Sequence, residues 1–278
     1  MTGLAKAVRL TKRYASFFKG SLTDDELYHW LIIDKPCSPG LLKKSFPQKS
    51  NRINKNHSKF NLARRVSSFL SSIPTIKFIA ATGSLAINHA KPNDDIDLMI
   101  VTSKNTLWLT RLFVVPLIGL FFKRRYPKIS NLKSQISNTI CMNLWLDESA
   151  LSVPVSKRNL YTAHEVLQAR PLFDRGNTYA KFIHANSWTS KYLANAYKII
   201  SQPHRAKTIP SSLVIPDLIG NLFKWIPAFA RMTNYLAFRL QYLYMKPKIT
   251  NETVTLHSAY FHPRSLANDL DKYLNQSR

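Results

Sequence analysis

Two aspartates separated by one residue, Asp95 and Asp97, stand at the head of a run of branched apolar residues. That run, residues 96–101, predicts a strand, and alternate side chains of a strand share a face. Both carboxylates should therefore lie together, where they repel each other unless a cation is bound between them. Oxygen ligands of this kind favour Mg²⁺. The adjacent Asp94 should point to the opposite face and act in the loop or as a cap.

A glycine turn precedes these acids. Residues 76–81 predict another short strand, and Gly83 and Ser84 follow it almost directly. Glycine adopts backbone angles that larger residues resist. A short helix should begin at Ser84, and its first N–H groups would point outward without partners inside the helix. Such amides suit a phosphate group. The stretch therefore predicts a phosphate site beside a metal site.

Gly83 and Ser84, ten further residues, and then Asp95-Ile96-Asp97 between hydrophobic flanks resemble the signature of the DNA polymerase beta-like nucleotidyltransferase superfamily. The resemblance implies that Gly83 and Ser84 contact the phosphates of a nucleoside triphosphate. It also implies that Asp95 and Asp97 are the catalytic residues that bind Mg²⁺. The alternative is an ordinary turn followed by a solvated strand start, and the combination at this spacing favours the superfamily.

The next strand departs from the superfamily pattern. Residues 139–146 predict a strand that is reached through a helix over residues 105–122 in a right-handed crossover. Many members carry a third acid in the middle of this strand, where Asn143 stands here. An amide can ligate a metal but cannot take the proton of an attacking hydroxyl. Asp147 or Glu148, just beyond the strand, are the alternatives; otherwise activation would fall to solvent or the metal.

Positive charge is concentrated at the two ends of the chain. The 278 residues carry a net charge of +25, of which residues 1–70 contribute +10, residues 71–150 contribute +4 and residues 151–278 contribute +11. Such a surface attracts polyanions, including nucleic acid, a triphosphate and anionic membrane. The alternative is a lysine-rich protein whose charge only aids solubility. Nucleic acid is therefore a candidate partner of the basic ends.

The cysteine content and the apolar segments indicate in which cellular compartment the protein is expected. Cys37 and Cys141 are too few and too far apart for a disulfide framework or a zinc site, and basic residues interrupt the N-terminus before a signal peptide could form. A cytoplasmic protein with reduced thiols is expected. Residues 112–122 are apolar but shorter than the about twenty residues that span a bilayer, and Pro116 interrupts them. A buried crossover helix is favoured over interfacial docking, and an integral membrane protein is not expected.

Composition divides the chain into three parts. Residues 1–68 predict a helical N-terminal unit, weakly similar to a winged helix, that ends in a basic linker. Residues 69–175 predict the nucleotidyltransferase domain, an α/β fold with a small mixed sheet. Residues 176–278 predict a helical region. Within it, residues 210–233 resemble the translation of a repeat that inserts in bacterial genomes; an apolar lid or a membrane-touching loop is the alternative.

Three helices carry further expectations. Thr23, with Glu26 three residues later, predicts a capping box at the start of a helix. Residues 159–172 predict a capped helix on which His164 is a surface histidine. Residues 179–200 predict an amphipathic helix whose aromatic residues fit a core better than base stacking.

The resemblance implies a Mg²⁺-dependent enzyme that transfers a nucleoside monophosphate from a triphosphate, with ATP as the expected donor, to an acceptor hydroxyl and releases pyrophosphate. RNA ends, a protein hydroxyl and a small aminoglycoside-like alcohol all remain open as acceptors. The main alternative is a nucleotide- or nucleic-acid-binding protein that keeps the fold without turnover, which Asn143 would accommodate. A third, weaker hypothesis is a membrane-associated protein that acts through residues 112–122 and 210–233.

Overall fold

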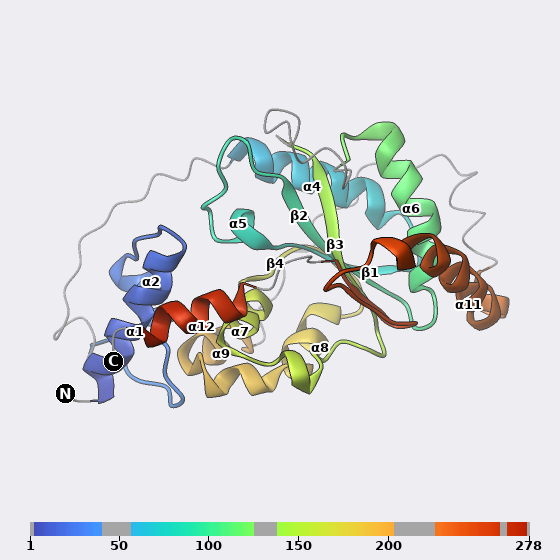
Figure 1. The fold of residues 1–278 in the computed structure, drawn as a ribbon. Coiled ribbons are helices and arrows are strands. Elements are labelled where there is room, and N and C mark those ends of the chain that lie inside the picture. The colour runs from blue at the N-terminus through green and yellow to red at the C-terminus, as the bar shows by residue number, and fades with distance from the viewer. Residues whose placement is uncertain (1–2, 41–56, 125–137, 203–225, 262–265, 277–278) are drawn as a thin grey trace.

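The computed structural model describes residues 3–40, 57–124, 138–202, 226–261 and 266–276 (Figure 1). Its centre is a six-stranded mixed sheet with the strand order β4-β1-β2-β3-β6-β5. The strands are β1 (Ile76–Ala81), β2 (Ile96–Thr102), β3 (Ile140–Asp147), β4 (Arg170–Asp174), β5 (Thr253–Val254) and β6 (Ser258–Tyr260). The predicted α/β class with a mixed sheet is therefore confirmed.

Helices surround this sheet. The α-helices are α1 (Gly3–Phe17), α2 (Asp24–His29), α4 (His57–Ser71), α5 (Gly83–Ala86), α6 (Leu107–Phe121), α7 (Leu160–Gln168), α8 (Thr178–Ala185), α9 (Ala194–Ile200), α11 (Ile226–Met245) and α12 (Ala267–Asn275). Single 3₁₀ turns are η2 (Val155–Lys157), η3 (Ser187–Lys191) and η4 (Lys246–Lys248).

Both faces of the sheet are buried, because its central strands are apolar on both sides. Ile79 and Leu98 lie in a core with residues of α4 and α6 on one face. Phe78 and Met99 lie in a second core with residues of α7, α8 and α9 on the other face. Figure 1 shows α4 and α6 on the opposite side of the strands from α7, α8 and α9. The period of two along each strand thus sends neighbouring side chains into two separate cores.

The parallel pair β2–β3 sets the positions of the polar side chains. β2 pairs antiparallel with β1 and parallel with β3, and α6 supplies the crossover between the two parallel strands, as predicted. In this register Asp97 lies beside Cys141, and Thr102 lies beside Asp147. Asp97 shares a face of β2 with Met99, so it lies on the α7 side of the sheet.

The N-terminal helices pack on the C-terminal part of the chain. Thr23 and Glu26 form the predicted capping box at the start of α2. Arg13 on α1 donates a hydrogen bond to the carbonyl of Tyr273 on α12, and the N–H of Ile33 donates to the carbonyl of Tyr192 (2.9 Å). In Figure 1, α1 and α2 lie together with α12, at the end of the molecule that carries both termini.

Three strands were not predicted. The expected helix over residues 159–172 ends at Gln168, and the chain turns directly into β4, which pairs with β1. β5 and β6 extend the sheet beyond β3, although the region after residue 176 was expected to be helical. The expected helix over residues 179–200 is divided into α8, η3 and α9. These strands depend on long-range pairing, which local periodicity does not report.

Helix α11 packs on α6 through polar side chains. Asn234 Oδ1 accepts hydrogen bonds from the N–H groups of Trp108 (2.7 Å) and Leu109 (3.2 Å). These amides belong to the first turn of α6, where a helix leaves its N–H groups without partners. Gln241 donates to the carbonyl of Trp108 (2.7 Å) and accepts from Arg111 (2.6 Å). α11 therefore caps α6 from outside.

The outer side of α6 is apolar yet exposed. Trp108, Val114 and Ile118 are buried, as expected for a crossover helix, but Leu112 and Leu120 are exposed, Leu120 to 76%. The prediction of a buried crossover helix is therefore confirmed for the inner side and wrong for the outer side. Within the described ranges, no helix combines the length and the apolar character that crossing a bilayer requires.

Two predicted segments fall largely on residues that the structure does not describe. Most of the basic linker lies in residues 41–56, and most of the repeat-like segment lies in residues 203–225. The end of that repeat-like segment, from Ile226, belongs to α11.

Candidate active site

The glycine turn after β1 lies directly against Asp97. Gly83 has a φ of +60°, and a Cβ built on it would lie 2.6 Å from Oδ2 of Asp97. The N–H of Thr82 donates to the carbonyl of Asp97 (3.0 Å), which holds the turn to β2. Neither the backbone angle nor the space allows a larger residue at this position. The residues that were predicted to bind phosphate and metal are therefore brought together.

The carboxylates of Asp95 and Asp97 converge with a thiol that the sequence analysis left out. One oxygen of each carboxylate and the Sγ of Cys141 all lie within 4.8 Å of one another, and all three residues are half-buried. Small side-chain movements from this separation would place them around one cation. Two carboxylates fit Mg²⁺, whereas a thiolate favours softer ions such as Mn²⁺ or Zn²⁺. Cys141 was missed because its position beside Asp97 depends on the register of β2 and β3.

Asn143 occupies the place expected for the third acid. Its Nδ2 donates to Oδ1 of Asp97 at 2.6 Å, and the side chain is 4% exposed. Asn143 lies two residues after Cys141, so the alternation of the strand places both side chains on the same face; a bulge in the β2–β3 register follows Met142. Its Oδ1 is buried, and no described residue donates a hydrogen bond to it. Such an oxygen is a suitable ligand for a cation but not a base.

Asp94 acts in the loop, as predicted. Its Oδ2 accepts hydrogen bonds from the hydroxyl of Ser84 (3.1 Å) and from the N–H of Lys91 (2.9 Å). These bonds tie the loop before β2 to the start of α5. Ser84 is thus fixed in position beside Gly83, while its predicted contact with phosphate stays a prediction.

Comparison with known proteins agrees with this geometry. Residues 63–139 match the family model described as "Nucleotidyltransferase domain". This part of the chain is similar to nucleotidyltransferase domains. The resemblance to the polymerase beta-like superfamily is thereby confirmed. The match covers the second half of α4 together with β1, α5, β2 and α6, and it ends just before Cys141 and Asn143.

Other comparisons add little. No curated protein matches the chain. One solved structure, "Crystal structure of the toxin-antitoxin with AMP-PNP", has 14% sequence identity, and the aligned region covers 45% of this chain and 85% of that chain. Its TM-score is 0.27, which is too low to support an argument about fold or function.

Lys59 on α4 brings a positive charge close to the acids. Its Nζ donates to the carbonyl of Asp94 at 2.5 Å, and only 4% of its surface is exposed. Burial lowers the pKa of Lys59, while the charges of Asp94 and Asp95 raise it. Residues 1–68 were expected to end in a basic linker, but α4 already begins at His57. The ammonium group reduces the repulsion between the acids.

Helix α7 brings two titratable side chains toward this domain's site. Burial raises the pKa of Glu165 to about 7, and a hydrogen bond from Tyr161 partly opposes the rise. Burial also raises the pKa of Tyr161 above its usual range, with further contributions from the charges of Glu165 and Asp97. Tyr161 is therefore close enough to interact electrostatically with a predicted metal ligand.

His164 on α7 is buried, so its prediction as a surface histidine was wrong. It is 2% exposed and stacks on Tyr14 of α1 with 3.8 Å between ring centroids. Burial, together with the charge of His29, lowers its pKa to about 3. A neutral His164 therefore joins α7 to the N-terminal helices.

Asp147 and Glu148 lie at the other end of β3 and do not supply the third acid. Asp147 pairs with Thr102, five residues along β2 from Asp97, which corresponds to about 16 Å along the strand. The carboxylate of Asp147 is fully buried and accepts hydrogen bonds from the N–H of Asn105 (3.1 Å) and from the side chain of His257 (2.7 Å). Asp147 therefore has a structural role.

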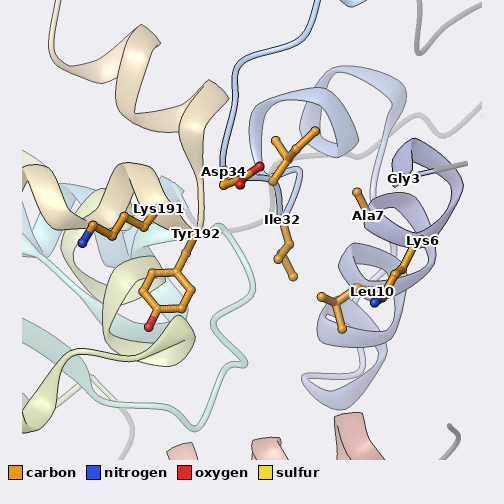
Figure 2. A pocket seen from close by; sticks show the side chains of 9 residues that line it. Gly3, Lys6, Ala7, Leu10, Ile32, Asp34, Lys191 and Tyr192 are labelled. Atoms are coloured by element: carbon orange, nitrogen blue, oxygen red, sulfur yellow. The ribbon is translucent and has the colours of Figure 1, made fainter.

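A cavity of about 250 Å³ lies away from these residues. Figure 2 shows α1 on one side of it and Lys191 and Tyr192 on the other. It is lined by Gly3, Lys6, Ala7, Leu10, Ile32, Ile33, Asp34, Lys191 and Tyr192. No residue of the candidate active site contributes to this lining.

Proposed function

We propose that this protein is a Mg²⁺-dependent nucleotidyltransferase that transfers a nucleoside monophosphate, with ATP as the expected donor, to an acceptor hydroxyl. The acceptor oxygen attacks the α-phosphorus, and the bond from this phosphorus to the oxygen that bridges to the β-phosphate breaks. Pyrophosphate leaves with the electron pair of that bond, and the acceptor proton passes to solvent. The family match of residues 63–139 supports transfer chemistry of this class.

The contact between Gly83 and Asp97 is the observation that carries the proposal. An ordinary turn does not require glycine at a distance where a Cβ would strike a carboxylate oxygen. A site that places a triphosphate over the turn and a cation beside it does require this closeness. In the proposed complex, Asp95 and Asp97 hold the cation, while Ser84 and the turn amides hold the leaving phosphates.

The residues fit a divalent cation. Two carboxylate oxygens and the thiol of Cys141 converge, and the buried Oδ1 of Asn143 lies on the same strand. When bound, Mg²⁺ would supply neutralisation of the phosphate charge. The chain itself aligns the acceptor and the α-phosphorus and excludes water from the reacting atoms. Lys59 lowers the repulsion between the acids before the substrate binds.

One observation favours a second candidate, a protein that binds a nucleotide or a nucleic acid without turnover. Asn143 has no basic group to take the acceptor proton, and its Nδ2 already donates to Oδ1 of Asp97 at 2.6 Å. The carboxylate of Asp97 then has one oxygen less for a cation. The basic ends of the chain are compatible with this candidate as well.

A labelling experiment separates the two candidates. The full chain is incubated with ATP labelled at the α-phosphate, with Mg²⁺, and with RNA, cell protein or an aminoglycoside panel as the acceptor. We expect the label to move to one acceptor class with equal release of pyrophosphate. Asp95→Asn should abolish the transfer, whereas Glu148→Gln, at the far end of β3, should not. Saturable ATP binding without labelled product for any acceptor would favour the binding protein.

The division of the chain at residues 68 and 175 stays a proposal. β5 and β6 join the sheet of the nucleotidyltransferase domain from beyond the second boundary, so truncation at residue 175 should impair folding. Activity assays should therefore use the full chain.

A further inference from the structure

Helix α11 buries two polar side chains against α6 and leaves several large apolar side chains exposed. Asn234 and Gln241 face α6, as described above. On the opposite side, four apolar side chains recur at helical spacing and are between 59% and 66% exposed. They are Met232, Leu236, Leu240 and Leu243, and we call them the α11 stripe. A helix at the surface of a water-soluble domain normally has the reverse arrangement.

Basic residues accompany the α11 stripe. Arg231 and Arg239 are exposed on α11, and Lys246 and Lys248 are exposed in η4 directly after it. Lys123 is exposed just after α6, whose own outer side is apolar. The sequences of α6 and α11 contain neither aspartate nor glutamate. In Figure 1 the two helices lie at the same end of the molecule, opposite α1 and α2.

We propose that this end of the molecule docks on an anionic lipid surface, with α11 parallel to the membrane plane. The α11 stripe enters the boundary between headgroups and acyl chains, and the arginines and lysines reach back to the lipid phosphates. An exposed apolar stripe, adjacent cations and the absence of acids on these helices together carry this inference. From Met232 to Leu243 the α11 stripe extends about 17 Å along the helix.

Two other occupants fit less well. A second copy of the chain would bring the same stripe against itself, and with it Arg231 and Arg239, with no carboxylate on either α11 to pair with them. A nucleic acid would use the arginines but would gain little from aliphatic leucines, because bases stack on aromatic or guanidinium planes. Lipid is the partner whose chemistry uses both the leucines and the cations.

The inference does not depend on the proposed function. α11 contacts the nucleotidyltransferase domain through α6, and none of the α11 stripe residues lies among the candidate site residues. Nucleotide transfer could therefore fail in an assay while lipid docking succeeds, and the reverse also holds.

Vesicle flotation of the full chain tests the proposal. Vesicles of phosphatidylcholine alone are compared with vesicles of phosphatidylcholine and phosphatidylglycerol. We expect the chain to float with the anionic vesicles only. The variant L236Q/L240Q/L243Q should bind at least about tenfold more weakly, because each substitution removes apolar groups that the leucine side chain would bury in lipid. In R231Q/R239Q the loss of each arginine should weaken binding roughly fivefold. The difference from the wild type should be smaller in high salt, which screens the charges.

A matched variant controls for net charge. K191Q/K198Q removes the same charge from exposed lysines of η3 and α9, and it should bind like the wild type. Because the changed leucines are exposed, their replacement should leave the circular dichroism spectrum unchanged. Hydrogen exchange of wild-type α11 provides a second measurement, since its amides should be protected by anionic vesicles and not by neutral ones.

Several results would overturn the proposal. One is a wild-type chain that does not float with anionic vesicles, and another is equal loss of binding in K191Q/K198Q. A dimer that the leucine variant dissociates, without any vesicle binding, would identify a second copy as the occupant. RNA binding that the leucine variant abolishes, again without vesicle binding, would identify a nucleic acid.

Discussion

The two ends of the parallel pair β2–β3 each carry an aspartate, and the surroundings of these aspartates differ. Asp97 is half-buried, next to Gly83, Cys141 and Asn143. Asp147 is fully buried and accepts hydrogen bonds from backbone and side chains around it. The first carboxylate lies among the residues of the candidate site, whereas the second is fully buried in structural hydrogen bonds. An aspartate at the end of a strand therefore indicates a ligand site only where the fold does not bury its carboxylate completely.

The strongest way to break this comparison is to neutralise Asp97. Asp97→Asn should lower nucleotide transfer by about a thousandfold, because it removes a charged ligand of the cation. Its melting temperature should stay within a few degrees of the wild-type value. Transfer is measured with α-labelled ATP and melting by circular dichroism. Retained transfer would show that Asp97 is not part of the site.

The equivalent substitution of Asp147, at the other end of β2 and β3, should lower stability and leave transfer unchanged. Asp147→Asn should lower the free energy of unfolding by about 3 kcal/mol, because the donors around this fully buried carboxylate lose a charged acceptor. The N–H of Ser149 and the side chain of His257 are such donors. Urea unfolding measures the change. The folded fraction should keep the wild-type rate of transfer, and a stable but inactive variant would contradict the distinction between the ends.

Gly83→Ala tests whether the closeness of the turn to Asp97 matters. The new Cβ would meet Oδ2 of Asp97, so we expect about a hundredfold loss of transfer. Gly176→Ala is the matched control, because Gly176 also has a positive φ, +71°, but nothing lies within 4 Å of its Cβ position. Both variants carry similar backbone strain. Equal loss of activity in both would attribute the effect to strain alone.

A fourth test concerns Glu165 on α7, whose carboxyl group has a pKa raised by burial. Its pKa is raised to about 7, so its contribution to stability is present below its ordinary pKa and is lost as the pH rises through 7. Glu165→Gln should therefore be more stable than the wild type at pH 8, by about 2 kcal/mol, and similar to it at pH 4. Thermal melting across this range gives the result. Glu148→Gln, which should lack this gain, is the control.

The smallest expected effect concerns Cys141. A thiolate ligand favours Mn²⁺ over Mg²⁺, so Cys141→Asp should shift the ratio of activities toward Mg²⁺ by about tenfold. Activities are measured with each ion separately. Cys37→Ser should leave the ratio unchanged, since Cys37 lies near Asn195 and not near the acids. An unchanged ratio in Cys141→Asp would remove Cys141 from the ligand set.

The elements around Asp97 could be predicted from the sequence because they are close together in the chain. β1, the turn at Gly83 and β2 all follow from local periodicity and from the angles that glycine permits. The role of Asp147, at the other end of the parallel pair, could not be predicted, since it depended on how β3 is aligned with β2. Only the register places Cys141 beside Asp97 and Asp147 beside Thr102.

Other features escaped prediction for the same physical reason. Lys59 precedes Asp94 by 35 residues, and only the folded position of α4 brings its ammonium group to the acids. β4, β5 and β6 are short; β4 and β6 pair with strands distant in sequence, and β5 joins the sheet only through β6. His164 has the polarity of a surface residue, but Tyr14 covers it. Side chains whose surroundings come from distant segments cannot be placed by periodicity alone.

The capping of α6 by Asn234 has a consequence for the order in which the molecule matures. The amide that closes the first turn of α6 comes from a residue 126 positions later than Trp108. On the ribosome, β1 and β2 emerge long before that amide does, so the crossover to β3 stays incomplete at its start until most of the chain has been synthesised. We therefore expect nascent chains that end before Asn234 to be more sensitive to proteolysis at residues 103–110 than full-length ones.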